Sequence, residues 1–161
     1  MITKNGSILL VNLYWGNITT PANTYRDING NLWNNTVSTS VVRINLFDPS
    51  RGISVMVGTG DSTPSFNDYA LDSTDVGGVD INTLVSITNG TITFDGMGQY
   101  NITFTITNTS NQDVTIKEVG IIENGSSGAL KMMIARNVIP AKTLAPSDTV
   151  TFTYTLSLFE L

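Results

Sequence analysis

A chain of 161 residues, 40% hydrophobic and only 13% charged, is long enough to bury a core of its own beneath a surface of mostly uncharged polar side chains. Its 8 basic and 13 acidic residues give a formal net charge of -5, which argues against a nucleic-acid partner and against a polybasic membrane patch. Cysteine and histidine are both absent, which removes disulfides, the commonest general base and the main zinc ligand. We therefore expect neither enzyme activity nor a cofactor.

The N-terminal third gives the weakest structural signal. Residues 7–15 fit either a strand or a short amphipathic helix, because periodicity does not separate the two over so short a span. Residues 17–35 are rich in Asn, Thr and Gly, which predicts a long loop or an extended arm. We therefore divide the chain into an N-terminal segment, 1–36, packed on or extending from the rest, and a domain at 37–161.

The middle of the chain contains several short strand candidates. Residues 39–47 and 53–57 are rich in apolar and β-branched side chains, and the turn at 48–52 joins them. Further along, Asn89-Gly90 lies between two β-branched runs, and this dipeptide is a strong signal for a two-residue hairpin turn. We therefore predict two separate strands on either side of it, at 86–88 and 91–94.

The second half alternates apolar and polar residues more regularly than any other part. Residues 100–107 and 148–158 keep a period of two without a break, the pattern of a strand with one buried and one solvated face. Strands are also predicted at 114–122 and 130–138, with turn residues between them. Short strands at near-regular spacing predict an all-β chain folded as an antiparallel β-sandwich, immunoglobulin-like or jelly-roll-like.

Two groups of residues invite a chemical interpretation. Asp72, Asp75 and Asp80 flank a Gly-rich turn, and such acids either bind calcium or are solvated loop residues; their spacing fits no EF-hand, so we expect no metal. Gly58-Thr59-Gly60 resembles a fragment of a phosphate-binding loop, but no Gly-Lys-Ser/Thr follows it. We interpret it as a turn in which Gly supplies a positive φ angle.

The aromatic residues of the first quarter suggest a contact surface. Tyr14, Trp15, Tyr25 and Trp33 fit a sugar-binding platform, a protein hot spot or buried anchors of the fold. We predict that Tyr25, Leu32 and Trp33 order against a neighbouring subunit, with Trp33 as the buried anchor, because a mobile polar segment would otherwise leave them in water.

Arg136 is a charged residue inside an otherwise apolar predicted strand. It is expected either to point to the solvated face or to pair with Glu118 or Glu123 on a neighbouring strand. A contact with another subunit is the alternative, so we include Arg136 among the candidate interface residues.

Five weak motifs follow one another along the chain in a fixed order. They are Gly-Thr-Gly, Thr-Pro and Asp-x-Ala-Leu within 57–72, Thr-Asn-Thr-Ser within 100–110, Ile-x-Glu-x-Gly within 114–121, Ala-Arg within 133–139 and the closing strand at 144–155. Their order resembles a group of small virion-associated β-sandwich proteins of tailed bacteriophages and related prokaryotic viruses. The resemblance covers residues 53–158, with Ser147 where those proteins commonly have glycine. It implies a structural protein of the virus particle (capsid accessory, neck or tail component) that binds copies of itself and other virion proteins as a homo-oligomer. A receptor- or carbohydrate-binding module of a tail fibre is the alternative.

Overall fold

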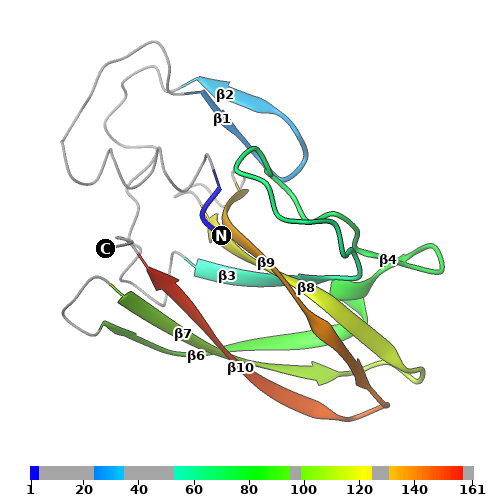
Figure 1. The fold of residues 1–161 in the computed structure, drawn as a ribbon. Helices are drawn as coiled ribbons and strands as arrows, with labels where there is room; N and C mark the ends of the chain where they lie inside the picture. Colours follow the sequence, from blue (N-terminus) through cyan, green and yellow to red (C-terminus); the bar gives the residue numbers. More distant parts are fainter. Residues whose placement is uncertain (4–23, 35–52, 95–98, 125–130, 158–161) are drawn as a thin grey trace. The chain divides into compact units, whose positions relative to one another are not determined.

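The computed structural model describes residues 1–3, 24–34, 53–94, 99–124 and 131–157 (Figure 1). These residues form strands and a single 3-10 turn, so the all-β prediction is confirmed for this part of the chain. No helix in it is long and apolar enough to cross a membrane. The elements are β1 (Thr24–Arg26), β2 (Leu32–Asn34), β3 (Ile53–Gly58), β4 (Asp75–Val76), β5 (Val79–Asp80), η1 (Ile81–Thr83), β6 (Val85–Phe94), β7 (Gln99–Asn108), β8 (Val114–Asn124), β9 (Lys131–Leu144) and β10 (Thr149–Ser157).

The strands form two three-stranded sheets and two small hairpins. One sheet has the order β10-β7-β6, and both of its pairings are antiparallel (Figure 1). The other has the order β3-β8-β9, and the hairpins are β1-β2 and β4-β5. The predicted strands at 53–57, 100–107, 114–122, 130–138 and 148–158 are therefore confirmed as β3, β7, β8, β9 and β10. The element expected at 7–15, the strand expected at 39–47 and the boundary expected at 36 lie outside the described residues.

The chain divides into two compact units, each with buried apolar residues of its own. The first comprises 1–54, 64–70 and 120–136, and the second comprises 55–63, 71–119 and 137–161. In the first, the ends of β8 and β9 bury Ile121, Ile122, Met132 and Met133. In the second, β3, β7, β8 and β10 bury alternate residues, and burial of each large side chain contributes about 1.5–3 kcal/mol. These are Val55, Val57, Ile102, Phe104, Ile106, Val114, Ile116, Tyr154 and Leu156.

The pairing of β7 with β10 shows why the alternating pattern was a reliable signal. The antiparallel register places Phe152 opposite Phe104, and their rings stack with centroids 5.6 Å apart. On the opposite face Thr151 lies across from Thr105, with their hydroxyl oxygens 3.1 Å apart. Apolar residues thus pair on the buried face and threonines on the other, as a strand with one solvated side requires.

The hairpin predicted at Asn89-Gly90 is wrong, because β6 continues through these residues. The register passes from Asn89 opposite Phe104 to Ile92 opposite Ile102, so β6 has one more residue than β7 over this step. The extra residue of this β-bulge shifts the alternation by one position. Odd-numbered apolar residues of β6 precede the bulge and even-numbered ones follow it, and both sets can therefore lie on the same face of the sheet. Glycine suits position 90 because a Cβ would stand 3.0 Å from the backbone oxygen of Thr103, a tight contact.

The loop predicted at 17–35 is wrong for residues 24–34, which form the β1-β2 hairpin. Asp27 lies in the turn and is almost fully buried. Its carboxylate accepts hydrogen bonds from the backbone N–H groups of Asn29 and Asn31, both 2.9 Å long. The N–H of Ile28 donates to the carbonyl of Lys131, so the hairpin is attached to β9. An Asp at the first position of the turn stabilises a tight hairpin, because its side chain accepts hydrogen bonds from the N–H groups of the turn itself.

The turn between β9 and β10 places a non-glycine residue in the left-handed region. The N–H of Asp148 donates to the carbonyl of Ala145 at 3.0 Å, and Pro146 and Ser147 are the central residues of the turn. Ser147 has a φ angle of 69°, the value that a type II turn requires at its third position and that favours glycine. The resemblance expects glycine at this position.

Replacing Ser147 with glycine is therefore expected to stabilise the protein, by about 0.5–1 kcal/mol, because the strain of the left-handed conformation exceeds glycine's added entropy cost. Urea unfolding followed by far-ultraviolet circular dichroism measures the change. Ser147→Ala removes the same hydroxyl and keeps the strain, so it serves as the control and should show no gain. Equal stabilisation of both variants would assign the effect to the hydroxyl instead of the backbone.

Candidate functional site

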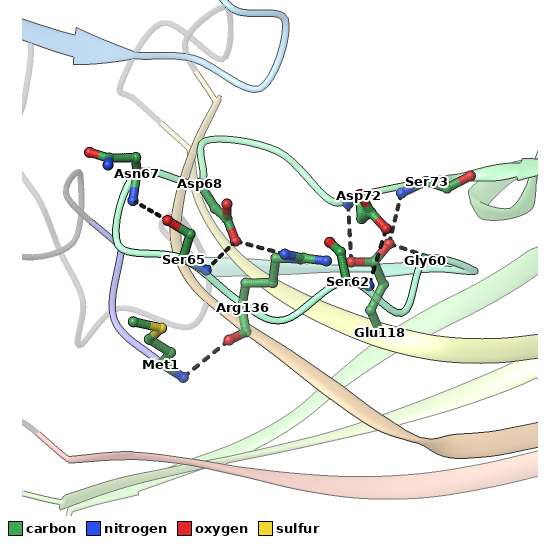
Figure 2. A network of polar contacts seen from close by, with 10 residues as sticks. All are labelled: Met1, Gly60, Ser62, Ser65, Asn67, Asp68, Asp72, Ser73, Glu118 and Arg136. Atoms are coloured by element: carbon green, nitrogen blue, oxygen red, sulfur yellow. Dashed lines mark hydrogen bonds and ion pairs between the residues drawn. The ribbon is translucent and has the colours of Figure 1, made fainter.

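The segment that follows β3, residues 59–74, is here called the strap, and its two ends meet at one buried carboxylate. Glu118 of β8 is fully buried. Its Oε1 accepts hydrogen bonds from the N–H of Gly60 at 3.1 Å and of Ser73 at 2.9 Å, while Oε2 accepts from the N–H of Asp72 at 3.1 Å (Figure 2). The N–H of Thr59 also donates to the carbonyl of Ser73 at 2.8 Å. Glu118 therefore holds the loop closed by satisfying backbone donors that would otherwise be buried without a partner.

The two glycines of the Gly-Thr-Gly motif are explained by this carboxylate. A Cβ on Gly58 would collide with Oε1 of Glu118 and come within 2.5 Å of the carbonyl oxygen of Ser73. A Cβ on Gly60 would stand 2.7 Å from the same Oε1. Neither glycine is among the residues with a positive φ angle, so the expected role of supplying one is wrong. Their function is close approach of the backbone to Glu118, with no sign of a phosphate-binding loop.

Arg136 forms a buried ion pair inside the first unit. Its side chain is 3% exposed, and its Nη1 lies 2.7 Å from Oδ2 of Asp68 in the strap (Figure 2). The same Asp68 oxygen accepts a hydrogen bond from the N–H of Ser65 at 2.8 Å. The expectations of a solvated Arg136 and of an ion pair with Glu123 are therefore wrong, whereas a pairing with Glu118 stays a prediction. Arg136 is buried in this chain, because the strap brings an acidic partner over an apolar strand.

Residues Met1–Thr3 lie along β9 beside Arg136. The N–H of Arg136 donates to the carbonyl of Met1, and the N–H of Thr3 donates to the carbonyl of Ile134, both at 3.0 Å. The hydroxyl of Thr3 donates to the carbonyl of Met133 at 2.6 Å. These bonds cover part of the edge of β9, so that this stretch is occupied by the chain itself.

Asn108 connects two other motifs of the resemblance in the second unit. Its side chain is buried, and its Nδ2 donates to the carbonyls of Gln112 at 2.8 Å and Leu144 at 2.9 Å. Its Oδ1 accepts from the N–H of Ser110 at 2.9 Å. One asparagine therefore fixes both the turn after β7 and the end of β9, which explains its place in the Thr-Asn-Thr-Ser motif.

The three aspartates considered for calcium each accept a hydrogen bond from a different backbone N–H group, two of them within local turns. Asp75 accepts from the N–H of Gly78 in the β4-β5 hairpin, where Gly77 and Gly78 both have positive φ angles. Asp80 caps η1 by accepting from the N–H of Asn82, and Asp72 accepts from the N–H of Ser62. In the described part of the chain no three acidic residues come together as metal ligands would.

The predicted interface residues of the hairpin have only partly been located. In the β1-β2 register Tyr25 lies opposite Trp33, and Arg26 lies opposite Leu32. Leu32 is 64% exposed, so its side chain is accessible on the surface of the hairpin. The guanidinium of Arg26 lies 4.8 Å above the ring of Tyr69, a second contact between the hairpin and its own unit. A contact of Tyr25, Leu32 and Trp33 with another subunit stays a prediction, and Tyr14 and Trp15 lie outside the described residues.

Two buried polar atoms have no hydrogen-bond partner in the described part of the chain: Oε2 of Glu123 and the hydroxyl of Tyr154. Burial raises the pKa of Glu123 to about 8, because the charged form is poorly solvated there. Burial also raises the pKa of Tyr154. Glu123 therefore keeps its proton at neutral pH.

Comparison with known proteins gives no relative for this chain: no family model, no curated protein and no solved structure matches it.

Proposed function

We propose that the chain is a non-enzymatic structural protein of a virus particle, which acts by binding copies of itself and other virion proteins. The observation that carries the proposal is that the motifs of the resemblance meet one another in the folded chain. Gly60 contacts Glu118, Asp68 pairs with Arg136, and Asn108 binds Leu144. The motif side chains that bear charge or an amide thus bind their own chain and stabilise the fold, as expected when the task is assembly.

The finer fold assignment belongs to the same proposal. The second unit contains one complete three-stranded sheet, β10-β7-β6, and parts of the three strands of the other. Strands of both sheets bury alternate apolar residues, Phe104 and Ile106 on β7 and Val114 and Ile116 on β8. Two sheets with one apolar face each are what a β-sandwich needs, and we propose that architecture for this unit.

The direct test is mass spectrometry of purified particles of the virus or provirus that encodes the chain. We expect the protein in the gradient fraction of intact particles, at a stoichiometry of many copies per particle. Recovery only in the soluble fraction of the lysate would contradict a structural role. A soluble form that binds cells or glycans would instead support the alternative of a tail-fibre binding module.

A variant of Leu32 tests the predicted contact surface in the same particles. Because Leu32 is 64% exposed, Leu32→Ser should leave the thermal stability of the purified protein within a degree or so of the parent. It should lower incorporation into particles. Phe66 is 47% exposed in the strap, so Phe66→Ser is the matched control for loss of an exposed apolar side chain. Equal incorporation of the two variants and the parent would remove Leu32 from the interface.

A further inference from the structure

Among the described residues, the solvent-facing side of the β10-β7-β6 sheet carries hydroxyl and amide side chains and no charged one. On β10 the residues of this face are Thr149, Thr151, Thr153 and Thr155. The first two lie 3.1 Å, hydroxyl to hydroxyl, from threonines of β7, and the hydroxyl of Thr155 donates to Oδ1 of Asn101 at 2.7 Å. A chain with a net charge of -5 repels its own copies least through such an uncharged surface.

Of the four outer strands of the two sheets, β3 and β9 are protected by their own chain. On β3, the N–H of Val57 donates to Oδ1 of Asn82, and Nδ2 of Asn82 donates back to the carbonyl of Val57, both at 2.9 Å. On β9, one part of the edge pairs with residues 1–3, and the other part contains Pro140 and Lys142. A bound side chain, a proline and a lysine all discourage pairing with another strand.

The other two outer strands differ from each other. β6 is interrupted by the bulge between Asn89 and Ile92, which bends and twists an edge. β10 has nine residues without a bulge, a proline or a charged side chain, and among the described residues its hydrogen-bonded neighbour is β7 alone. In the part of the chain that the structure describes, β10 therefore has none of the bulges, prolines, charges or covering segments that keep a strand edge from pairing with another chain.

The hydrogen bonds to β7 indicate which backbone groups of β10 point outward. The N–H of Asn108 donates to the carbonyl of Asp148 at 2.9 Å, immediately before the register that places Thr149 opposite Thr107. In an antiparallel ladder the residues alternate between bonding to the neighbour and pointing away from it. The odd-numbered residues, which include Thr151, Thr153 and Thr155, therefore direct their N–H and C=O groups away from β7.

The sequence of β10 is nearly symmetric about Thr153. Reading outward from it in both directions gives an aromatic residue, then threonine, then an aliphatic residue, then a hydroxyl residue. If two copies of β10 pair in antiparallel fashion about this centre, Phe152 faces Tyr154 of the partner copy, Thr151 faces Thr155, Val150 faces Leu156 and Thr149 faces Ser157. Every pair then matches in kind, as in the observed pairing with β7.

We propose that β10 is a homotypic interface, at which two copies of the chain join their sheets by antiparallel pairing centred on Thr153. The register makes Thr153 a hydrogen-bonded pair with itself and Thr151 a hydrogen-bonded pair with Thr155, in agreement with the backbone directions. The result is a six-stranded sheet with the order β6-β7-β10-β10-β7-β6. This inference deepens the proposed function, since it names one of the contacts between subunits.

A charge exchange across this register tests the proposal. In Thr151→Lys/Thr155→Lys, each new lysine faces a lysine of the other copy, so the dissociation constant of the dimer should rise on the order of tenfold or more at low salt. In Thr151→Lys/Thr155→Glu each lysine faces a glutamate, which should restore association. The two positions are four residues apart on one strand, roughly 13 Å, so the pairs interact little within a copy. Sedimentation equilibrium measures the dissociation constants, and Thr88→Lys, on the β6 edge of the same face, is the control.

Cysteine trapping gives a second test, because the parent has no cysteine. Cα atoms of a hydrogen-bonded antiparallel pair lie about 5.5 Å apart, within the range that a disulfide spans. Thr153→Cys should therefore form a disulfide-linked dimer under mild oxidation. Thr151→Cys should not, because residue 151 faces residue 155 of the partner copy and lies far from the partner's residue 151. Circular dichroism confirms that each variant folds.

The proposal is overturned if the parent sediments as a monomer at its highest soluble concentration. It is equally overturned if the two charge variants associate alike, or if Thr151→Cys is trapped as fast as Thr153→Cys. These results leave the proposed function untouched when the protein is nevertheless found in purified particles. A dimer with the predicted register that is absent from particles would instead contradict the proposed function alone.

Discussion

Replacing Glu118 with alanine is expected to lower the free energy of unfolding by about 3–5 kcal/mol, because three backbone N–H groups lose their acceptor inside the protein. Glu118→Gln should cost less, about 1–3 kcal/mol. Its single amide oxygen serves Gly60 and Ser73, which share Oε1 in the parent, but its NH₂ group then faces the N–H of Asp72. Urea unfolding followed by circular dichroism should thus rank the parent first, the glutamine variant second and the alanine variant last.

The neighbouring residue on β8 supplies the control for this prediction. Lys117 forms an ion pair of 3.2 Å with Asp61, but the two side chains are 39% and 74% exposed. Water and salt screen such a pair, so Lys117→Ala should change the free energy of unfolding by less than about 1 kcal/mol. If Glu118→Ala is as stable as the parent, then Glu118 is not what closes the strap.

The fold was predictable wherever one periodic pattern ran without interruption. β7 and β10 alternate along their whole length, and the structure places both as predicted. β6 was misinterpreted because its alternation changes phase at Asn89-Gly90. A phase change fits a hairpin turn or a bulge equally well on local evidence, and the long-range register against β7 selects the bulge.

The polar contacts were less predictable, although their residues were visible in the sequence. Glu118, Glu123 and Arg136 are charged residues inside apolar strands, which signals that each needs a partner or loses its charge. Which partner each has depends on the path of the strap, and no local pattern specifies that path. Asp68 and the backbone of Gly60 are far away in sequence from Arg136 and Glu118, so the sequence did not predict Asp68 as a partner of Arg136.

Glu123 is a buried carboxyl residue with one oxygen that has no hydrogen-bond partner among the described residues. It is 1% exposed, and its Oε2 has no hydrogen bond in the described residues. Arg136, the cation once expected to pair with it, binds Asp68 instead. Desolvation therefore raises the pKa of Glu123 from an ordinary 4.5 to about 8.

This shift makes stability depend on pH in a defined direction. Below pH 4.5 the carboxyl is protonated in both the folded and the unfolded chain, so it costs nothing on ionisation grounds. As the pH rises toward 8, the unfolded chain releases the proton while the folded chain keeps it, and the free energy of unfolding falls. Between pH 5 and pH 7.5 the loss should be roughly 3 kcal/mol, since each pH unit in this window corresponds to about 1.4 kcal/mol.

Glu123→Gln keeps the shape of the side chain and cannot ionise, so its contribution should be flat across this window. We expect the gain of the variant over the parent to be roughly 3 kcal/mol larger at pH 7.5 than at pH 5. Urea midpoints at the two pH values measure both differences. Asp113 is exposed in the turn after β7, and Asp113→Asn removes one carboxyl without any buried group, so its effect should be small at both pH values. A parent that is as stable at pH 7.5 as at pH 5, with no gain in the glutamine variant, would mean that Glu123 ionises in the folded protein. The carboxylate would then have to be solvated or paired, and the free energy of unfolding would not depend on pH through Glu123.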